Sequence, residues 1–305
     1  FFYVVEIVYI YTIINKNNNK MVKLSKQQKI AVELGQAKRN GLIRQTKRIA
    51  RKLKGSNSSY NDFLIAGPSG TGKSFNIEKT LDEMGLQYYK LTGNVSIFGF
   101  MGNLMYLHSQ KPKGQKLAIY LDDTDFLFDP KNINILKMLT STKPGDRKFE
   151  YTKSVNEKQF SEAQQQVLHN YLNEGTHGLT IPCDDFMFIF ASNIDLADET
   201  QIDSMTASQK KKANHDLAIR GRFKPYDFKL NKEEKWGWIY DAAINDGALD
   251  MLDQDQDKLY LLDWMWSNWD KMKETSIRTI EKMAEDMLDE PEDYKDYWSI
   301  DYLAK

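Results

Sequence analysis

The segment from Phe63 to Ser74 carries the residues whose spacing most clearly predicts chemistry. It reads FLIAGPSGTGKS, and its glycine-rich part has the complete spacing of a phosphate-binding loop. Glycines let successive backbone N–H groups turn toward one anion. We expect Lys73 to reach the β- and γ-phosphates of a nucleotide, and the Ser74 hydroxyl to ligate magnesium. The alternative is an ordinary glycine-rich turn. The predicted loop consists of Gly67, Pro68, Ser69, Gly70, Thr71, Gly72, Lys73 and Ser74.

Two acids, Asp122 and Asp123, follow the apolar run at residues 117–121. Carboxylates at the carboxyl end of a buried strand lie in the crevice where open α/β sheets bind ligands. Asp122 is expected to hold the magnesium shell, and Asp123 to orient and deprotonate the attacking water. Adjacent acids in this position could instead cap a helix.

Polar side chains also follow two later segments. Asn193 comes after the apolar run at residues 186–191, and its amide can both donate and accept, which suits positioning of water or a γ-phosphate. Arg220 and Arg222 end a predicted helix. They are either solvated helix-end charges or nucleotide ligands.

These side chains can meet only if several strands end at one edge of a sheet. We expect strands at residues 63–66, 87–91, 117–121, 186–191 and 226–230. Helices are expected at residues 75–83 and 98–107, and residues 216–223 are expected to form the end of a third helix. Residues 148–151 and 159–173 are expected to form a β segment and a polar helix of an insertion. Residues 24–53 show a helical pattern that Gly35 and Gly41 interrupt.

The C-terminal part predicts a helical unit rich in aromatic residues. Its expected helices are residues 233–244, 258–273 and 276–288, with Ser276 as an N-cap. The aromatic cluster is expected to form core, the alternative being base stacking. It consists of Trp236, Trp238, Tyr240, Trp264, Trp266 and Trp269.

Charge is distributed unevenly along the 305 residues. Residues 20–54 hold twelve Lys or Arg and one acid, whereas residues 231–305 hold twenty acids and nine Lys or Arg. The basic stretch at residues 38–54 could bind nucleic-acid phosphates or form a solvated helix face. The single cysteine, Cys183, fits a reducing compartment such as the cytoplasm, and the four histidines lack zinc-ligand spacing.

The first residues are apolar but do not predict a membrane span. The run at residues 1–14 is shorter than the roughly 20 residues that cross a bilayer. We expect residues 1–20 to lie upstream of the true start at Met21. The expected domains are residues 1–20 as this leader, 21–59 as a basic helical segment and linker, 60–230 as the α/β domain and 231–305 as helices with an acidic tail.

Together these motifs resemble the AAA+ ATPases over about residues 61–288. The runs LDDTDFLFDPKNINILK, FASNIDL and AIRGRF are similar to uncharacterised AAA+ ATPases of tailed bacteriophages. The resemblance implies a three-layer P-loop NTPase domain around a parallel sheet, followed by a small helical lid. It identifies residues 67–74 as Walker A, Asp122 and Asp123 as Walker B, and Asn193 as sensor 1. Arg222, with Arg220 competing, matches the arginine finger, and Arg278 matches sensor 2.

The resemblance also implies ATP and Mg²⁺ as cofactors and a homo-oligomer in which the finger acts on the neighbouring subunit. The substrate that the ATPase remodels, called its load below, is expected to be a nucleoprotein or protein complex, as in phage DNA replication or loading. One departure is Asp123, which stands where the family most often has Glu, so that hydrolysis could be slow or Asp125 could share the role. A P-loop kinase and a slow nucleotide-gated binding module are the alternatives. The segment Ile97-Phe98-Gly99 resembles a pore loop, unless Phe98 is a core residue.

Overall fold

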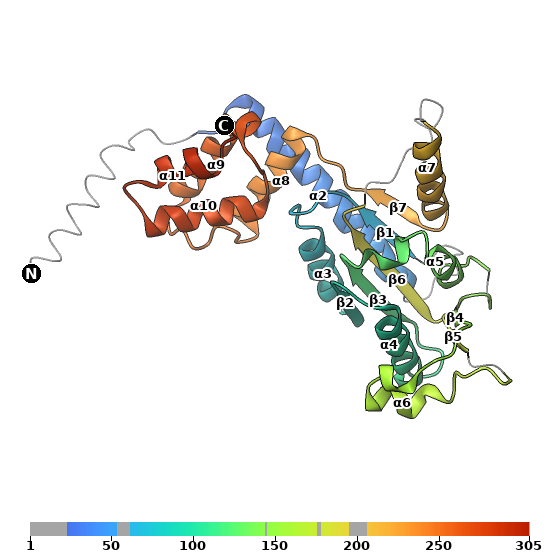
Figure 1. The fold of residues 1–305 in the computed structure, drawn as a ribbon. Helices are drawn as coiled ribbons and strands as arrows, with labels where there is room; N and C mark the ends of the chain where they lie inside the picture. The colour runs from blue at the N-terminus through green and yellow to red at the C-terminus, as the bar shows by residue number, and fades with distance from the viewer. Residues whose placement is uncertain (1–22, 54–61, 144, 176–177, 195–205, 305) are drawn as a thin grey trace, which may run out of the picture. The chain divides into compact units, whose positions relative to one another are not determined.

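The computed structural model describes residues 23–53, 62–143, 145–175, 178–194 and 206–304 (Figure 1). It divides into two compact units. The α/β unit comprises Asn40–Lys229, and the helical unit comprises Phe1–Arg39 with Leu230–Lys305. The expected leader at residues 1–20 and the linker at 55–59 lie outside the described residues. No described helix is long and apolar enough to cross a membrane.

The α/β unit is built on a five-stranded sheet in which every neighbouring pair is parallel. Its spatial order is β2 (Tyr88–Thr92), β3 (Leu117–Asp122), β6 (Phe186–Ser192), β1 (Phe63–Ala66) and β7 (Lys224–Asp227). The register pairs Ala66 with Ser192 and Asp122 with Ala191. Therefore the chain leaves β1, β3 and β6 at the same edge, which brings three distant segments of sequence together.

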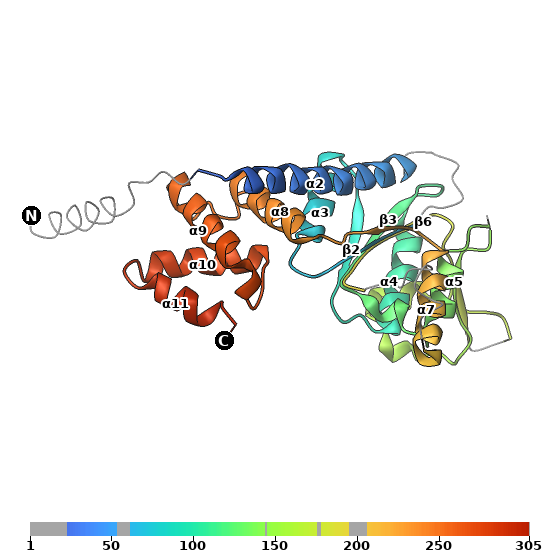
Figure 2. The same cartoon turned by 90° about the horizontal axis from the view of Figure 1, so that it is seen from above.

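Helices cover both faces of this sheet (Figure 2). α4 (Ile97–Gln110), α5 (Ile133–Leu139) and α7 (Ala207–Arg220) lie on one side, and α3 (Lys73–Glu83) lies on the other with the second half of α2 (Lys26–Leu53). Phenylalanines from β6 and α4 fill much of the core on the first side, where Phe100, Phe188 and Phe190 are buried. The predicted three-layer α/β fold is confirmed.

The final strand of the sheet begins earlier than predicted. β7 spans Lys224–Asp227 and contains Pro225, whereas the expected strand began after this proline. Proline cannot donate a ladder hydrogen bond, so it is confined to edge strands. β7 is an edge of the sheet and pairs with β1 alone among the described strands, which explains why Pro225 is tolerated.

The helix predicted in the insertion between β3 and β6 is shorter than expected, and a second helix was not predicted. The described residues of the insertion form two 3₁₀ turns, Asp125–Phe128 and Glu157–Gln159, and two helices, α5 and α6 (Glu162–Leu168). The expected helix at residues 159–173 is therefore wrong in extent. A capping box between Ser161 and Gln164 sets the start of α6. Past its end, the Thr180 amide donates to the Tyr171 carbonyl, which draws the chain into β pairing.

A short strand that was not predicted completes the insertion. β5 (Leu179–Pro182) pairs antiparallel with the expected β segment, β4 (Lys148–Tyr151). Arg147, next to β4, lies buried with its Nη2 atom 2.9 Å from both the Asp62 Oδ1 atom and the Phe186 carbonyl. Asp62 also accepts from the Phe188 amide. These contacts fasten the insertion to the starts of two central strands.

The helical unit contains α8 (Lys232–Asn245), α9 (Asp255–Asn268), α10 (Ile277–Asp289) and α11 (Tyr294–Asp301), with a 3₁₀ turn at Trp269–Lys271. Ser276 caps α10 as predicted, because its Oγ atom accepts from the Thr279 amide. Trp236 is fully buried, and its indole N–H donates to the Leu262 carbonyl. Trp264, Trp266 and Trp269 pack partly buried against the same core. The prediction that the aromatic cluster forms core is confirmed.

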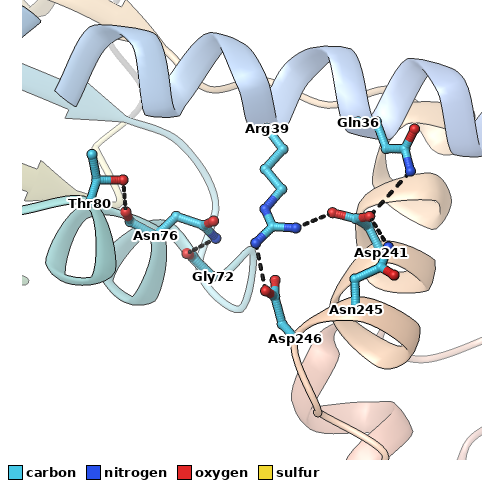
Figure 3. A network of polar contacts seen from close by, with 8 residues as sticks. All are labelled: Gln36, Arg39, Gly72, Asn76, Thr80, Asp241, Asn245 and Asp246. Carbon is cyan, nitrogen blue, oxygen red and sulfur yellow. Dashed lines mark hydrogen bonds and ion pairs between the residues drawn. The ribbon is translucent and has the colours of Figure 1, made fainter. Parts of the chain in front are cut away.

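The predicted interruptions of α2 are wrong, since the helix runs unbroken from Lys26 to Leu53. Gly35 instead permits close contact within the helical unit, where an added Cβ would lie 2.3 Å from the Gly237 carbonyl carbon on α8. Four residues later, Arg39 donates to Asp241 and Asp246 (Figure 3). Lys38 forms an ion pair with Glu234. Two cations of the predicted nucleic-acid segment are therefore committed to contacts inside the helical unit.

Candidate active site

The glycine-rich loop joins β1 directly to α3. Gly70 and Gly72 have φ of 68° and 68°, a left-handed conformation that disfavours residues with a side chain. A Cβ on Gly67 would lie 2.4 Å from the Phe228 carbonyl oxygen. The Thr71 hydroxyl donates to the Pro68 carbonyl. The Asn76 side-chain amide donates to the Gly72 carbonyl (Figure 3). The sequence pattern thus corresponds to a turn with a fixed shape at the N-terminus of a helix.

Lys73 is the first residue of α3, and its side chain turns back over the loop. Only 5% of the residue is exposed. Its Nζ atom lies 2.9 Å from the Gly67 carbonyl oxygen, 2.7 Å from that of Pro68 and 3.0 Å from Asn193 Oδ1. The ammonium group is therefore held, largely shielded from solvent, at the place where the loop is expected to bind phosphate.

Ser74 and Asp122 supply a pair of oxygen atoms suited to a hard cation. The Ser74 hydroxyl donates to Asp122 Oδ1 over 2.6 Å, joining the second residue of α3 to the last residue of β3. In the described part of the chain, no group of three His, Cys, Asp or Glu side chains could hold a metal by itself. Mg²⁺ commonly binds through one or two protein oxygens together with substrate phosphates. The donor pair fits that mode.

Asp123 has a strained backbone and a fixed side chain. Its φ of 51° makes it the one non-glycine residue with positive φ in the described ranges. Such strain often accompanies function, and Asp tolerates this conformation better than most residues. The Asn193 amide nitrogen donates to Asp123 Oδ1 over 2.9 Å. Since the Asn193 oxygen accepts from Lys73, one amide joins the loop cation to the second acid.

Lys90 and Glu78 also belong to this cluster, although the sequence did not single them out. Lys90 Nζ lies 2.5 Å from Glu78 Oε1 and 3.4 Å from Asp122 Oδ2. Burial alone would lower the pKa of Lys90, but the hydrogen bond and charge of Glu78, with the charge of Asp122, raise it overall. Burial and, secondarily, the Asp122 charge raise the pKa of Tyr120. No sequence signal identifies Lys90, because it comes near Asp122 only through the strand register that pairs it with Tyr120.

The three candidate arginines have other surroundings. Arg220 Nη1 donates to Asp227 Oδ2 over 2.8 Å, whereas the contact of Arg222 Nη1 with the Lys137 carbonyl is long, at 3.5 Å. Arg278 lies exposed on α10 in the helical unit. The structure thus groups Lys73, Ser74, Asp122, Asp123 and Asn193 through side-chain contacts.

Phe98 packs as a core residue rather than as a loop tip. It lies in the first turn of α4, which Ser96 caps. Its ring makes edge-to-face contacts with Tyr151 at 5.4 Å and Phe160 at 6.3 Å between centroids. These contacts favour the core interpretation over the pore-loop interpretation.

Comparison with known proteins gives a low likeness to solved structures. No protein-family model and no curated protein matches the chain. Two variants of RuvB from Thermotoga maritima are similar with TM-scores of 0.35 and 0.34, at 12% and 11% sequence identity. The matches cover 75% and 82% of this chain. They cover 55% and 61% of the two RuvB chains, so the protein spans less than two thirds of either.

Proposed function

We propose that the protein binds and hydrolyses Mg-ATP as an AAA+ type P-loop ATPase. The observation that carries this proposal is the position of the Asn193 amide, which contacts the loop lysine on one side and Asp123 on the other. The Asn193 amide thereby holds both the proposed phosphate-binding cation, Lys73, and the candidate base, Asp123, at the edge of the sheet. Arg278 is proposed to act as a second sensor.

The proposed roles follow from the chemistry of each side chain. The loop amides and Lys73 bind the β- and γ-phosphates and stabilise charge that develops on them. Ser74 and Asp122 would hold Mg²⁺, which neutralises phosphate charge when bound. Asp123 accepts the proton of the attacking water, and Asn193 keeps its carboxylate in place. The short Asp side chain is proposed to make hydrolysis slower than it would be with Glu.

Asp123→Asn is expected to bind ATP almost normally and to lose hydrolysis. General-base catalysis contributes about 10²- to 10⁴-fold, so phosphate release should fall by that range. Asparagine is the suitable replacement because it also tolerates positive φ, which alanine does not. Nucleotide titration and phosphate release are measured side by side.

Loss of ATP binding in this variant would show that Asp123 maintains the loop rather than the reaction. A wild-type protein that binds ATP but releases no phosphate, even with DNA or protein added, would favour the nucleotide-gated binding module. Transfer of phosphate to a small molecule would favour a kinase. If hydrolysis is found, the Asp123→Asn protein becomes the bait for capturing the load.

We also propose that the load includes nucleic acid, bound along the second half of α2. Arg44, Arg48 and Arg51 recur at helical spacing on its exposed side with Lys47 beside them, while Leu42 and Ile49 are buried on the opposite side. Residues 40–53 contain no acid. The stripe from Arg44 to Arg51 spans about 10 Å, the length of about three nucleotides of a strand. Lys52 is buried and is excluded from it.

Glutamine at all four stripe positions should abolish salt-dependent DNA binding. Four phosphate contacts on duplex DNA predict a slope near −3.6 for log affinity against log salt, which is about a 100-fold loss between 50 and 200 mM salt. Fluorescence anisotropy with a labelled duplex measures both. A matched control carries the same charge change at exposed positions of the same unit: Lys113, Lys116, Lys153 and Lys158. Salt-insensitive binding, or equal loss in both variants, would identify the stripe as a solvated helix face.

A further inference from the structure

Four side chains around the proposed magnesium position form a continuous chain of contacts, whose two ends lie on one helix. Ser74 Oγ lies 2.6 Å from Asp122 Oδ1, and Asp122 Oδ2 lies 3.4 Å from Lys90 Nζ. Lys90 Nζ lies 2.5 Å from Glu78 Oε1. Glu78 and Ser74 are four residues apart on α3, so they occupy one face of that helix. Each oxygen of the Asp122 carboxylate therefore has its own partner.

The backbone explains why Lys90 reaches Asp122. β2 and β3 are parallel neighbours, and their register pairs Lys90 with Tyr120. Tyr120 and Asp122 are two residues apart, so all three side chains emerge from the same face of the sheet. The Lys90 ammonium lies 5.7 Å from the centroid of the Tyr120 ring, so the side chain extends over that ring along the sheet. The remaining reach to Asp122 is a diagonal that a long side chain can cover.

Charge indicates what the lysine does there. A cation beside a metal-binding carboxylate would repel Mg²⁺ if it acted alone. Glu78 offsets this charge, since it forms the shorter of the two contacts with Lys90. The remaining effect of Lys90 is to orient the Asp122 carboxylate. The ammonium contacts Oδ2 of Asp122, while Oδ1 accepts from Ser74. Partners of this kind orient metal ligands, and their loss typically lowers metal affinity by about 10- to 100-fold.

We propose that Lys90, anchored by Glu78, is a positioning residue that fixes the Asp122 carboxylate for divalent-cation binding beside Ser74. This inference rests on the proposed function, because it assumes that the cation binds with a nucleotide. It concerns the metal rather than the phosphates, which Lys73 serves. It therefore predicts a defect in metal binding that nucleotide binding alone does not share.

The test measures binding of Mn²⁺, a spectroscopic substitute for Mg²⁺, in the presence of ADP. Free Mn²⁺ is followed by electron paramagnetic resonance in wild type, Lys90→Met, Lys90→Arg and Lys79→Met. Lys90→Met should weaken Mn²⁺ binding by about 10- to 100-fold, and Lys90→Arg, which keeps a cation between the two acids, should restore most of it. Lys79→Met is the matched control. Lys79 is exposed on α3 and packs over the Phe75 ring as Lys90 does over Tyr120.

Each other result overturns the proposal. Unchanged or tighter Mn²⁺ binding in Lys90→Met would mean that Lys90 does not orient Asp122. Equal loss of ADP binding without metal, measured in chelator, or a large fall in unfolding temperature would show that Lys90 supports the sheet in general. If wild type binds ADP and Mn²⁺ while Lys90→Met does so equally, only this inference fails. If wild type binds neither, the proposed ATPase function fails with it.

Discussion

Replacement of Lys73 with alanine is expected to weaken ATP binding by at least about 100-fold. Lys73 is the cation of the loop, and hydrogen bonds to charged groups contribute about 1.5–3 kcal/mol each. Two such bonds to phosphate correspond to about 3 kcal/mol or more, where 1.4 kcal/mol is tenfold in affinity. Titration with a fluorescent ATP analogue and isothermal calorimetry both measure this loss.

Lys79→Ala is the control for this substitution. It removes the same charge from the same helix, but Lys79 lies exposed. Its ATP affinity should match that of wild type. Thermal unfolding without nucleotide checks that the Lys73 variant keeps its fold, because Lys73 also bonds Gly67, Pro68 and Asn193. A folded Lys73→Ala protein with near-normal affinity would refute the assignment of the loop.

Arg222→Ala is expected to bind ATP almost normally and to hydrolyse it about 10³- to 10⁵-fold more slowly. A finger arginine stabilises charge in the transition state of phosphoryl transfer, and this range is its usual contribution. Arg222 is favoured over Arg220 because Arg220 is held in an ion pair with Asp227, whereas the Arg222 contact with Lys137 is long. Arg220→Ala, assayed in parallel, should lose much less activity.

The oligomeric assignment of Arg222 has its own test. If the finger acts on the neighbouring subunit, mixing Arg222→Ala with Lys73→Ala should restore part of the activity. Interfaces of one polarity then combine an intact loop with an intact finger. Specific activity of wild type should also rise with protein concentration as subunits assemble. Activity that is constant down to the monomer, with no recovery in the mixture, would mean that the protein acts alone.

The sequence by itself determined those parts that depend on neighbouring residues. Six loop residues between an apolar run and Lys73 predict a strand, a turn and a helix, since glycine conformation and helix capping are local effects. Asp122 and Asn193 could also be identified locally, because each follows an apolar run that predicts a buried strand. Parallel strands that end at one edge then bring them to the loop.

Tertiary structure alone decided the contacts that join distant segments. Gly35 breaks no helix, because packing against Gly237 offsets the cost of glycine in α2. Arg147 resembles any surface arginine until the fold buries it against Asp62. Lys90 becomes part of the candidate site only through the register of β2 against β3, which no local pattern specifies. Local sequence determines which side chains are available for chemistry, whereas the partner of a charged group depends on which strands and helices become neighbours.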